Sequence, residues 1–194
     1  MLGVVLCGGQ SSRMGSDKGL LKPEAKTWVQ TAFDKLAELN FTTVISVNKK
    51  QYDDYAFIFG PTALISDDAT LAIHGPLSGV LSVHLRHPSD DLLVLACDMP
   101  LMETGLLKEL LVNYHQYSNA DALVYTNDGE PEPLCGIYKS GGLAQIIKLY
   151  RSNQLPKHSM KYMLEHINTN FLVLPGDKKN CFRNFNTHAE LNGL

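Results

Sequence analysis

The 194-residue sequence has few of the features expected of a secreted or membrane protein. No run approaches the roughly 20 consecutive apolar residues that a membrane-spanning helix needs. The N-terminal segment lacks basic residues and breaks into glycine at Gly8 and Gly9, which is too early for a signal peptide. We therefore expect a cytoplasmic protein that does not bind a membrane.

Cysteine is also scarce, and its spacing excludes two classes of small domain. The four cysteines are spread along the chain, without a CxxC pair and without a histidine at ligand spacing: Cys7, Cys97, Cys135 and Cys181. This spacing argues against a zinc ribbon and against a disulfide scaffold. Cys7 and Cys97 each end an apolar run, so we expect them to be small buried side chains.

The sequence lacks an excess of charge of either sign. It has 17 Lys+Arg and 20 Asp+Glu, a formal net charge of −3, which argues against nucleic acid as a partner. Hydrophobic residues make up 44% and charged residues 19%, as in ordinary globular proteins. No linker-like stretch divides the chain, so we expect a single domain over residues 1–194.

Short apolar runs alternate with longer amphipathic segments, which is the pattern of an α/β fold. Helices are predicted at 27–39, 76–83, 103–117, 142–150 and 160–166, and strands at 4–7, 43–47, 63–66, 92–97, 122–126, 134–138 and 171–174. The run at 92–97 is apolar on both faces, as in a central parallel strand. We expect a Rossmann-like, three-layer, mostly parallel sheet with helices on both faces and a small antiparallel extension.

Polar clusters follow three of the predicted strands, at 8–18, 66–68 and 98–100. In open parallel sheets, ligands bind beyond the carboxyl ends of the strands, where the strand order reverses. The three clusters could therefore share one edge of the sheet and form a ligand site there.

The first cluster has the composition of a phosphate-binding loop. Gly8 and Gly9 allow close approach of the backbone to a ligand, and free N–H groups in such a turn suit phosphate oxygens. Arg13 and Lys18 add positive charge. The spacing matches neither GxxxxGK[ST] nor GxGxxG. We expect this segment to bind the phosphates of a nucleoside triphosphate.

The segment LCGGQSSRMGSDKGLL (6–21) resembles the signature LxGGxSxRMGxDKxLL of the molybdenum cofactor nucleotidyltransferases, above all the guanylyltransferases. Further similar segments follow in order: ISDD (65–68), HGPLSGVLSV (74–83), LACDMPLM (95–102), PLCGIY (133–138) and FRNFNTHAEL (182–191). The opening signature is shared with sugar-phosphate nucleotidyltransferases, whereas the full set of segments in this order is specific to a much narrower group of proteins. The resemblance implies a fold like that of the nucleotide-diphospho-sugar transferases.

The resemblance also implies roles for individual residues. Arg13, Lys18 and Asp98 would be catalytic, and Asp98 would hold Mg²⁺, the implied cofactor. Asp68 would accept hydrogen bonds from the guanine base, although adjacent Asp67 leaves open which of the two acts. The residues expected to bind GTP are Leu6, Cys7, Gly8, Gly9, Lys18, Asp68 and Asp98, and those expected on the pterin side are Asn184 and Asn186.

The implied reaction is transfer of GMP from GTP to molybdopterin, with release of pyrophosphate. GTP and molybdopterin would be the substrates, and a molybdoenzyme or its chaperone could receive the product. Alternatives within enzymes are a cytidylyltransferase for the same pterin or a sugar-phosphate nucleotidyltransferase. The alternative outside enzymes is a regulatory module that binds a nucleotide without turning it over.

Overall fold

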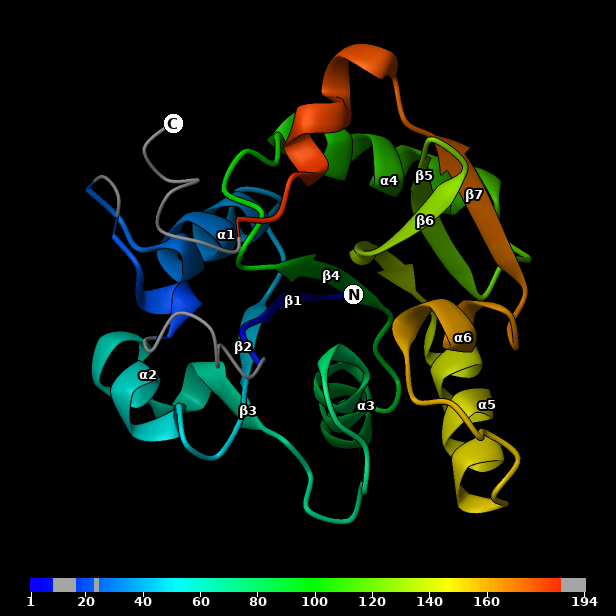
Figure 1. Cartoon of the computed structure of the whole chain (residues 1–194), viewed down its shortest axis with the longest axis horizontal. Helices are drawn as coiled ribbons and strands as arrows, with labels where there is room; N and C mark the ends of the chain where they lie inside the picture. The colour runs from blue at the N-terminus through cyan, green and yellow to red at the C-terminus, as the bar shows by residue number, and fades with distance from the viewer. Residues whose placement is uncertain (9–16, 23–24, 186–194) are drawn as a thin grey trace.

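The computed structural model describes residues 1–8, 17–22 and 25–185 (Figure 1). The strands are β1 (Leu2–Leu6), β2 (Thr43–Val47), β3 (Leu64–Ser66), β4 (Leu92–Ala96), β5 (Ala122–Asn127), β6 (Glu130–Tyr138) and β7 (Thr169–Val173). The α-helices are α1 (Trp28–Ala37), α2 (Tyr52–Phe59), α3 (Pro76–Arg86), α4 (Thr104–Gln116), α5 (Ser140–Arg151) and α6 (Met160–Leu164). Three short 3₁₀ helices are η1 (Lys18–Leu20), η2 (Pro61–Ala63) and η3 (Gly176–Phe182).

The strands form one seven-stranded sheet in the order β3-β2-β1-β4-β6-β5-β7. Neighbouring strands from β3 to β4 are parallel, and β7 is parallel to β5. Strand β6 is antiparallel to both β4 and β5. The expected mostly parallel sheet with a small antiparallel extension is therefore confirmed.

Helices cover both faces of the sheet (Figure 1). Buried side chains of α1, α2 and α4 pack with Leu93 and Leu95 of β4 on one face. Those of α3, α5 and α6 pack with Leu92 and Val94 on the other face. All five residues of β4 are buried, as the apolar run at 92–97 predicts. Among the described residues, no helix combines the length and apolar character needed to cross a membrane.

Helix α2 is absent from the sequence-based prediction, and its burial pattern explains why. Of its eight residues only Tyr55 is buried, whereas Phe57 is 94% exposed. Its apolar side chains therefore do not follow the buried-face spacing by which an amphipathic helix is recognised. The other α-helices and all the strands lie where they were predicted, with ends displaced by a few residues, whereas the three 3₁₀ helices were not predicted.

Asp91, directly before β4, joins three elements and gives a stability prediction. Its carboxylate accepts hydrogen bonds from Tyr114 of α4 and from the backbone N–H of Ser140, the first residue of α5. Burial alone would raise the pKa of Asp91, but these hydrogen bonds outweigh it and lower the pKa. The ionised carboxylate is therefore favoured in the folded protein.

We expect Asp91→Ala to lower the free energy of unfolding by about 2 kcal/mol at pH 7, because two hydrogen bonds to a carboxylate are lost. Since the folded-state pKa lies below the unfolded value of about 3.9, this stability is present above that pH and disappears as the pH falls through the folded pKa. Urea unfolding at pH 7 and pH 3 measures the effect. Asp90→Ala is the control, because Asp90 makes only surface ion pairs. Equal losses in both variants, or a pH-independent loss, would contradict the prediction.

Candidate active site

The strand order reverses at β1, which lies between β2 and β4. The pairing continues to the ends of these strands: the N–H of Cys7 donates to the carbonyl of Ser46 (3.0 Å), and that of Cys97 donates to the carbonyl of Leu6 (3.1 Å). Gly8 and Asp98 are the next residues along the chain. The structure therefore brings the start of the glycine-rich segment and the Asp98 segment to the position where open α/β sheets bind ligands.

Asp98 is half-buried directly beyond β4. Burial raises the pKa of this carboxyl, whereas the positive charge of Lys18 lowers it. Lys18, at the end of the glycine-rich segment, therefore lies close enough to Asp98 for its charge to act on that carboxyl. Asp98 does not cap α4, because that helix begins at Thr104 with Glu103 at the N-cap position. A capping role for Asp98 at the start of α4 is thus excluded.

Lys18 begins η1, and Asp17 caps this short helix. The Asp17 carboxylate accepts a hydrogen bond from the N–H of Gly19 at 2.9 Å. Gly19 is required by close packing, since a Cβ at this position would lie 2.2 Å from the hydroxyl oxygen of Tyr55. The backbone that carries Lys18 is therefore held tightly against α2.

The two aspartates after β3 occupy different surroundings. Asp68 accepts hydrogen bonds from the N–H (2.8 Å) and the hydroxyl (2.6 Å) of Thr70, and these bonds lower its pKa. Burial raises the pKa of Asp67, and a hydrogen bond with Ser78 in the first turn of α3 partly offsets this. Asp67 therefore faces the start of α3, whereas Asp68 binds within its own turn. The role of Asp68 in base recognition stays a prediction.

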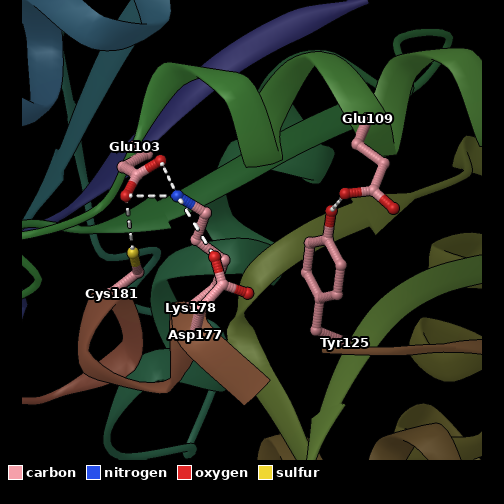
Figure 2. A network of polar contacts seen from close by, with 6 residues as sticks. All are labelled: Glu103, Glu109, Tyr125, Asp177, Lys178 and Cys181. Atoms are coloured by element: carbon pink, nitrogen blue, oxygen red, sulfur yellow. Dashed lines mark hydrogen bonds and ion pairs between the residues drawn. The ribbon is translucent and has the colours of Figure 1, made fainter. Parts of the chain in front are cut away.

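The C-terminal segment reaches the site because η3 is attached to the start of α4 (Figure 2). The Lys178 ammonium lies 2.8 Å from the Glu103 carboxylate, and the Cys181 thiol donates to the same carboxylate at 3.5 Å. Beyond η3, the N–H of Phe185 lies 3.5 Å from the Asp98 carbonyl, and the Phe185 ring lies against that of Trp28.

Asn184 therefore lies in the chain directly before the residue that contacts the Asp98 backbone. Its side-chain oxygen Oδ1 is buried and has no hydrogen-bond partner among the residues that the structure describes. Buried amide oxygens are nearly always satisfied, so this oxygen suits a ligand that supplies a donor. This is compatible with the pterin-side role expected for Asn184.

Three expected site residues lie outside the described residues: Gly9, Arg13 and Asn186. Leu6 and Cys7, both buried, and Gly8 end β1 or follow it directly, at the same edge as Asp98. Sequence reasoning missed Asp17, Gln51 and Tyr55. Only Asp17 had a signal, its position next to Lys18 in the signature.

Among the described residues, Asp98 is the candidate ligand for a metal ion at this site. Within the described ranges, no group of three or more His, Cys, Asp or Glu side chains is placed to hold an ion. The Asp17 carboxylate already accepts hydrogen bonds from Gly19, Gln51 and Tyr55. Mg²⁺ is typically held by one or two carboxylates together with substrate phosphates and water, so Asp98 fits Mg²⁺ delivered with a nucleotide.

The fold is that of an open α/β protein, in which a ligand is expected at the switch point of the sheet. Residues 3–169 match the MobA-like NTP transferase domain. The chain belongs to this family of nucleotidyltransferases, which confirms the family expected from the sequence motifs.

Similar proteins cover nearly the whole chain. It is 30% identical to a probable molybdenum cofactor guanylyltransferase of a Geobacillus species, over 100% of this chain and 97% of that protein. It is 27% identical to a protein of the same description from Flavobacterium johnsoniae, over 98% and 94% of the two chains. The crystal structure of molybdopterin-guanine dinucleotide biosynthesis protein A from Archaeoglobus fulgidus superimposes with a TM-score of 0.79 at 24% identity, covering 100% and 96% of the chains.

Proposed function

We propose that this chain transfers GMP from GTP to molybdopterin and releases pyrophosphate. The observation that carries the proposal is that Gly8 and Asp98 follow the paired ends of β1 and β4 at the switch point, where the charge of Lys18 also acts on the Asp98 carboxyl. Two similar proteins described as probable molybdenum cofactor guanylyltransferases support the choice of substrates.

In this reaction a terminal phosphate oxygen of molybdopterin attacks the α-phosphorus of GTP. The bond between the α-phosphorus and the bridging oxygen to the β-phosphate breaks, and the electron pair leaves with pyrophosphate. Both reactants are polyanions, so charge repulsion and positioning dominate the barrier. The phosphate is ionised near pH 7, and no general base is needed.

The residues at the switch point suit this chemistry. Lys18, with Arg13 and the backbone amides of Gly8 and Gly9, would neutralise the triphosphate and the charge that develops on pyrophosphate. Asp98 would hold Mg²⁺, which supplies a Lewis acid for the phosphate oxygens when bound.

The two substrates would lie on different sides of Asp98. The ends of β1 and β3, with Leu6, Cys7 and Asp68, would surround the nucleoside. Asn184, on the segment that crosses the Asp98 backbone, would face the pterin together with Asn186. A carboxylate accepts from both N1–H and the N2 amine of guanine, a pairing that cytosine cannot make, which favours GTP.

Pyrophosphate release with GTP or CTP, each with and without molybdopterin, tests the proposal. We expect release only with GTP, molybdopterin and Mg²⁺ together, and formation of a molybdopterin guanine dinucleotide detectable by mass spectrometry. A preference for CTP would establish a cytidylyltransferase instead. Release with a sugar phosphate but not with molybdopterin would overturn the choice of acceptor. GTP binding without any turnover would make the chain a binding module.

A further inference from the structure

A buried glutamine outside the sequence motifs connects both ends of the glycine-rich segment. Gln51 directly precedes α2 and is 9% exposed. Its side-chain nitrogen Nε2 donates to the Cys7 carbonyl at 2.9 Å and to the Asp17 carboxylate at 2.6 Å. Its oxygen Oε1 accepts from the N–H of Asn48 at 3.1 Å. One carboxamide thus spans the residues that precede and follow 8–16.

The Asp17 carboxylate is fixed from its other side as well. Its second oxygen accepts from the Tyr55 hydroxyl at 3.0 Å and from the N–H of Gly19 at 2.9 Å. Tyr55 is completely buried, so its hydroxyl has little freedom to follow a shifted carboxylate. Asp17 in turn caps the helix that begins with Lys18. The contacts therefore run from Cys7 through Gln51 and Asp17 to the backbone of Lys18.

We propose that Gln51 is a positioning residue for nucleotidyl transfer. Its carboxamide sets the separation between Cys7 and Asp17, and thereby holds Lys18 opposite Asp98. The proposal rests on the proposed function for its reaction. Gln51 itself touches neither reacting group and acts through Asp17.

The chemistry of this position requires an amide. Only a carboxamide has two N–H donors on one atom for two acceptors, and an acceptor oxygen beside them for a third contact. Hydrogen bonds to a carboxylate are stronger than neutral ones, and losing the donor would remove the Gln51 hydrogen bonds to the buried Cys7 carbonyl and to the Oδ2 oxygen of Asp17. Losing the Gln51 donors would therefore destabilise Cys7 and Asp17, the two residues between which the glycine-rich segment runs.

Gln51→Glu removes both donors while keeping the size of the side chain and the acceptor for Asn48. The introduced carboxylate would then repel the Cys7 carbonyl and the Asp17 carboxylate, and Asp17 would move away from it. We expect the kcat of transfer to fall and the Kd for GTP to rise, each by roughly tenfold, with the KM for molybdopterin unchanged. The loss should shrink at acidic pH, where the introduced carboxyl is protonated and can donate to one acceptor again.

Gln145→Glu is the matched control. Gln145 makes the same kind of contact, from its Nε2 to the His166 carbonyl at 2.8 Å, on an exposed part of α5. This variant should keep the wild-type kcat, GTP affinity and pH profile. Thermal unfolding of all variants shows whether a loss of activity comes from unfolding of the protein or, in a variant that stays folded, from a displaced Lys18.

Asp17→Asn opposes the same bond from the other side, since its new amide nitrogen faces Nε2 of Gln51. It should show the same losses, and it replaces Gln51→Glu as the test if that variant does not fold. In the double variant the introduced amide donates to the introduced carboxylate. We expect its kcat to be about tenfold higher than the value that would result if the two single losses simply multiplied.

Wild-type kcat and GTP affinity in Gln51→Glu or in Asp17→Asn, or strictly multiplicative losses in the double variant, would overturn the proposal. Calorimetric titration with GTP alone keeps the test independent of the acceptor. If the wild-type protein binds GTP without transferring GMP to molybdopterin, the proposed function fails. The role of Gln51 is then still decided by the GTP affinity of the variants.

Discussion

Asp98→Asn should abolish Mg²⁺-dependent nucleotidyl transfer, with a fall in kcat of about three orders of magnitude. Asp98 is the carboxylate that we propose holds Mg²⁺ at the switch point, and a metal at a phosphoryl site typically contributes several kcal/mol to transition-state stabilisation. Each factor of ten in rate corresponds to about 1.4 kcal/mol. Pyrophosphate release as a function of Mg²⁺ concentration measures the effect, and the variant should show almost no dependence on the metal.

The same substitution should leave the fold stable, which separates a metal-binding role from a structural one. Burial raises the pKa of Asp98, so the ionised carboxylate costs folding free energy at pH 7. A neutral amide of the same shape relieves that cost, and we expect the melting temperature to be unchanged or higher. Asp90→Asn, before the opposite end of β4, is the control for activity. Full Mg²⁺-dependent rate in Asp98→Asn would remove Asp98 from the catalytic site.

Much of the site could be predicted because its residues follow strands directly. The ends of parallel strands share one edge, so knowing that 4–7 and 92–97 are strands places Gly8 and Asp98 near each other once both strands are central. The structure confirms that β1 and β4 are neighbours, with Leu6 opposite Ala96.

The contacts around Gln51 could not be predicted from the sequence. They join residues 44 and 34 positions apart, and they depend on where α2 packs. The apolar pattern of α2 gives little sign of the helix, because Phe57 and Ile58 are exposed. A glutamine is also common on protein surfaces, and nothing in the local sequence distinguishes a buried one.

The choice between Asp67 and Asp68 shows a second limit of the sequence. Both follow β3, and adjacent residues in an irregular segment can point in any direction. Their surroundings are set by side chains that lie later in the chain: Ser78 bonds to Asp67, and the N–H of Asp68 donates to the hydroxyl of Ser82 at 2.8 Å. Local sequence could identify the pair of aspartates but not the partner of each.

Lys18→Ala should lower kcat by about two to three orders of magnitude, comparable to the loss of one preorganised oxyanion donor. The charge of Lys18 acts on the carboxyl of Asp98, at the site where the charge that develops on pyrophosphate would have to be neutralised. Because Lys18 acts more strongly as charge moves onto the leaving group, the KM for GTP should rise less than kcat falls.

Lys22→Ala is the control, since Lys22 is an exposed cation two residues beyond η1. It tests whether any positive charge near this segment is sufficient. Steady-state kinetics with GTP and molybdopterin at fixed Mg²⁺ compares the two variants. A large rise in the KM for GTP with unchanged kcat would limit Lys18 to ground-state binding, and equal losses in Lys18→Ala and Lys22→Ala would assign the effect to net charge. A selective loss of kcat in Lys18→Ala requires a cation held at one place, which is the arrangement that Asp17 and Gly19 impose on the start of η1.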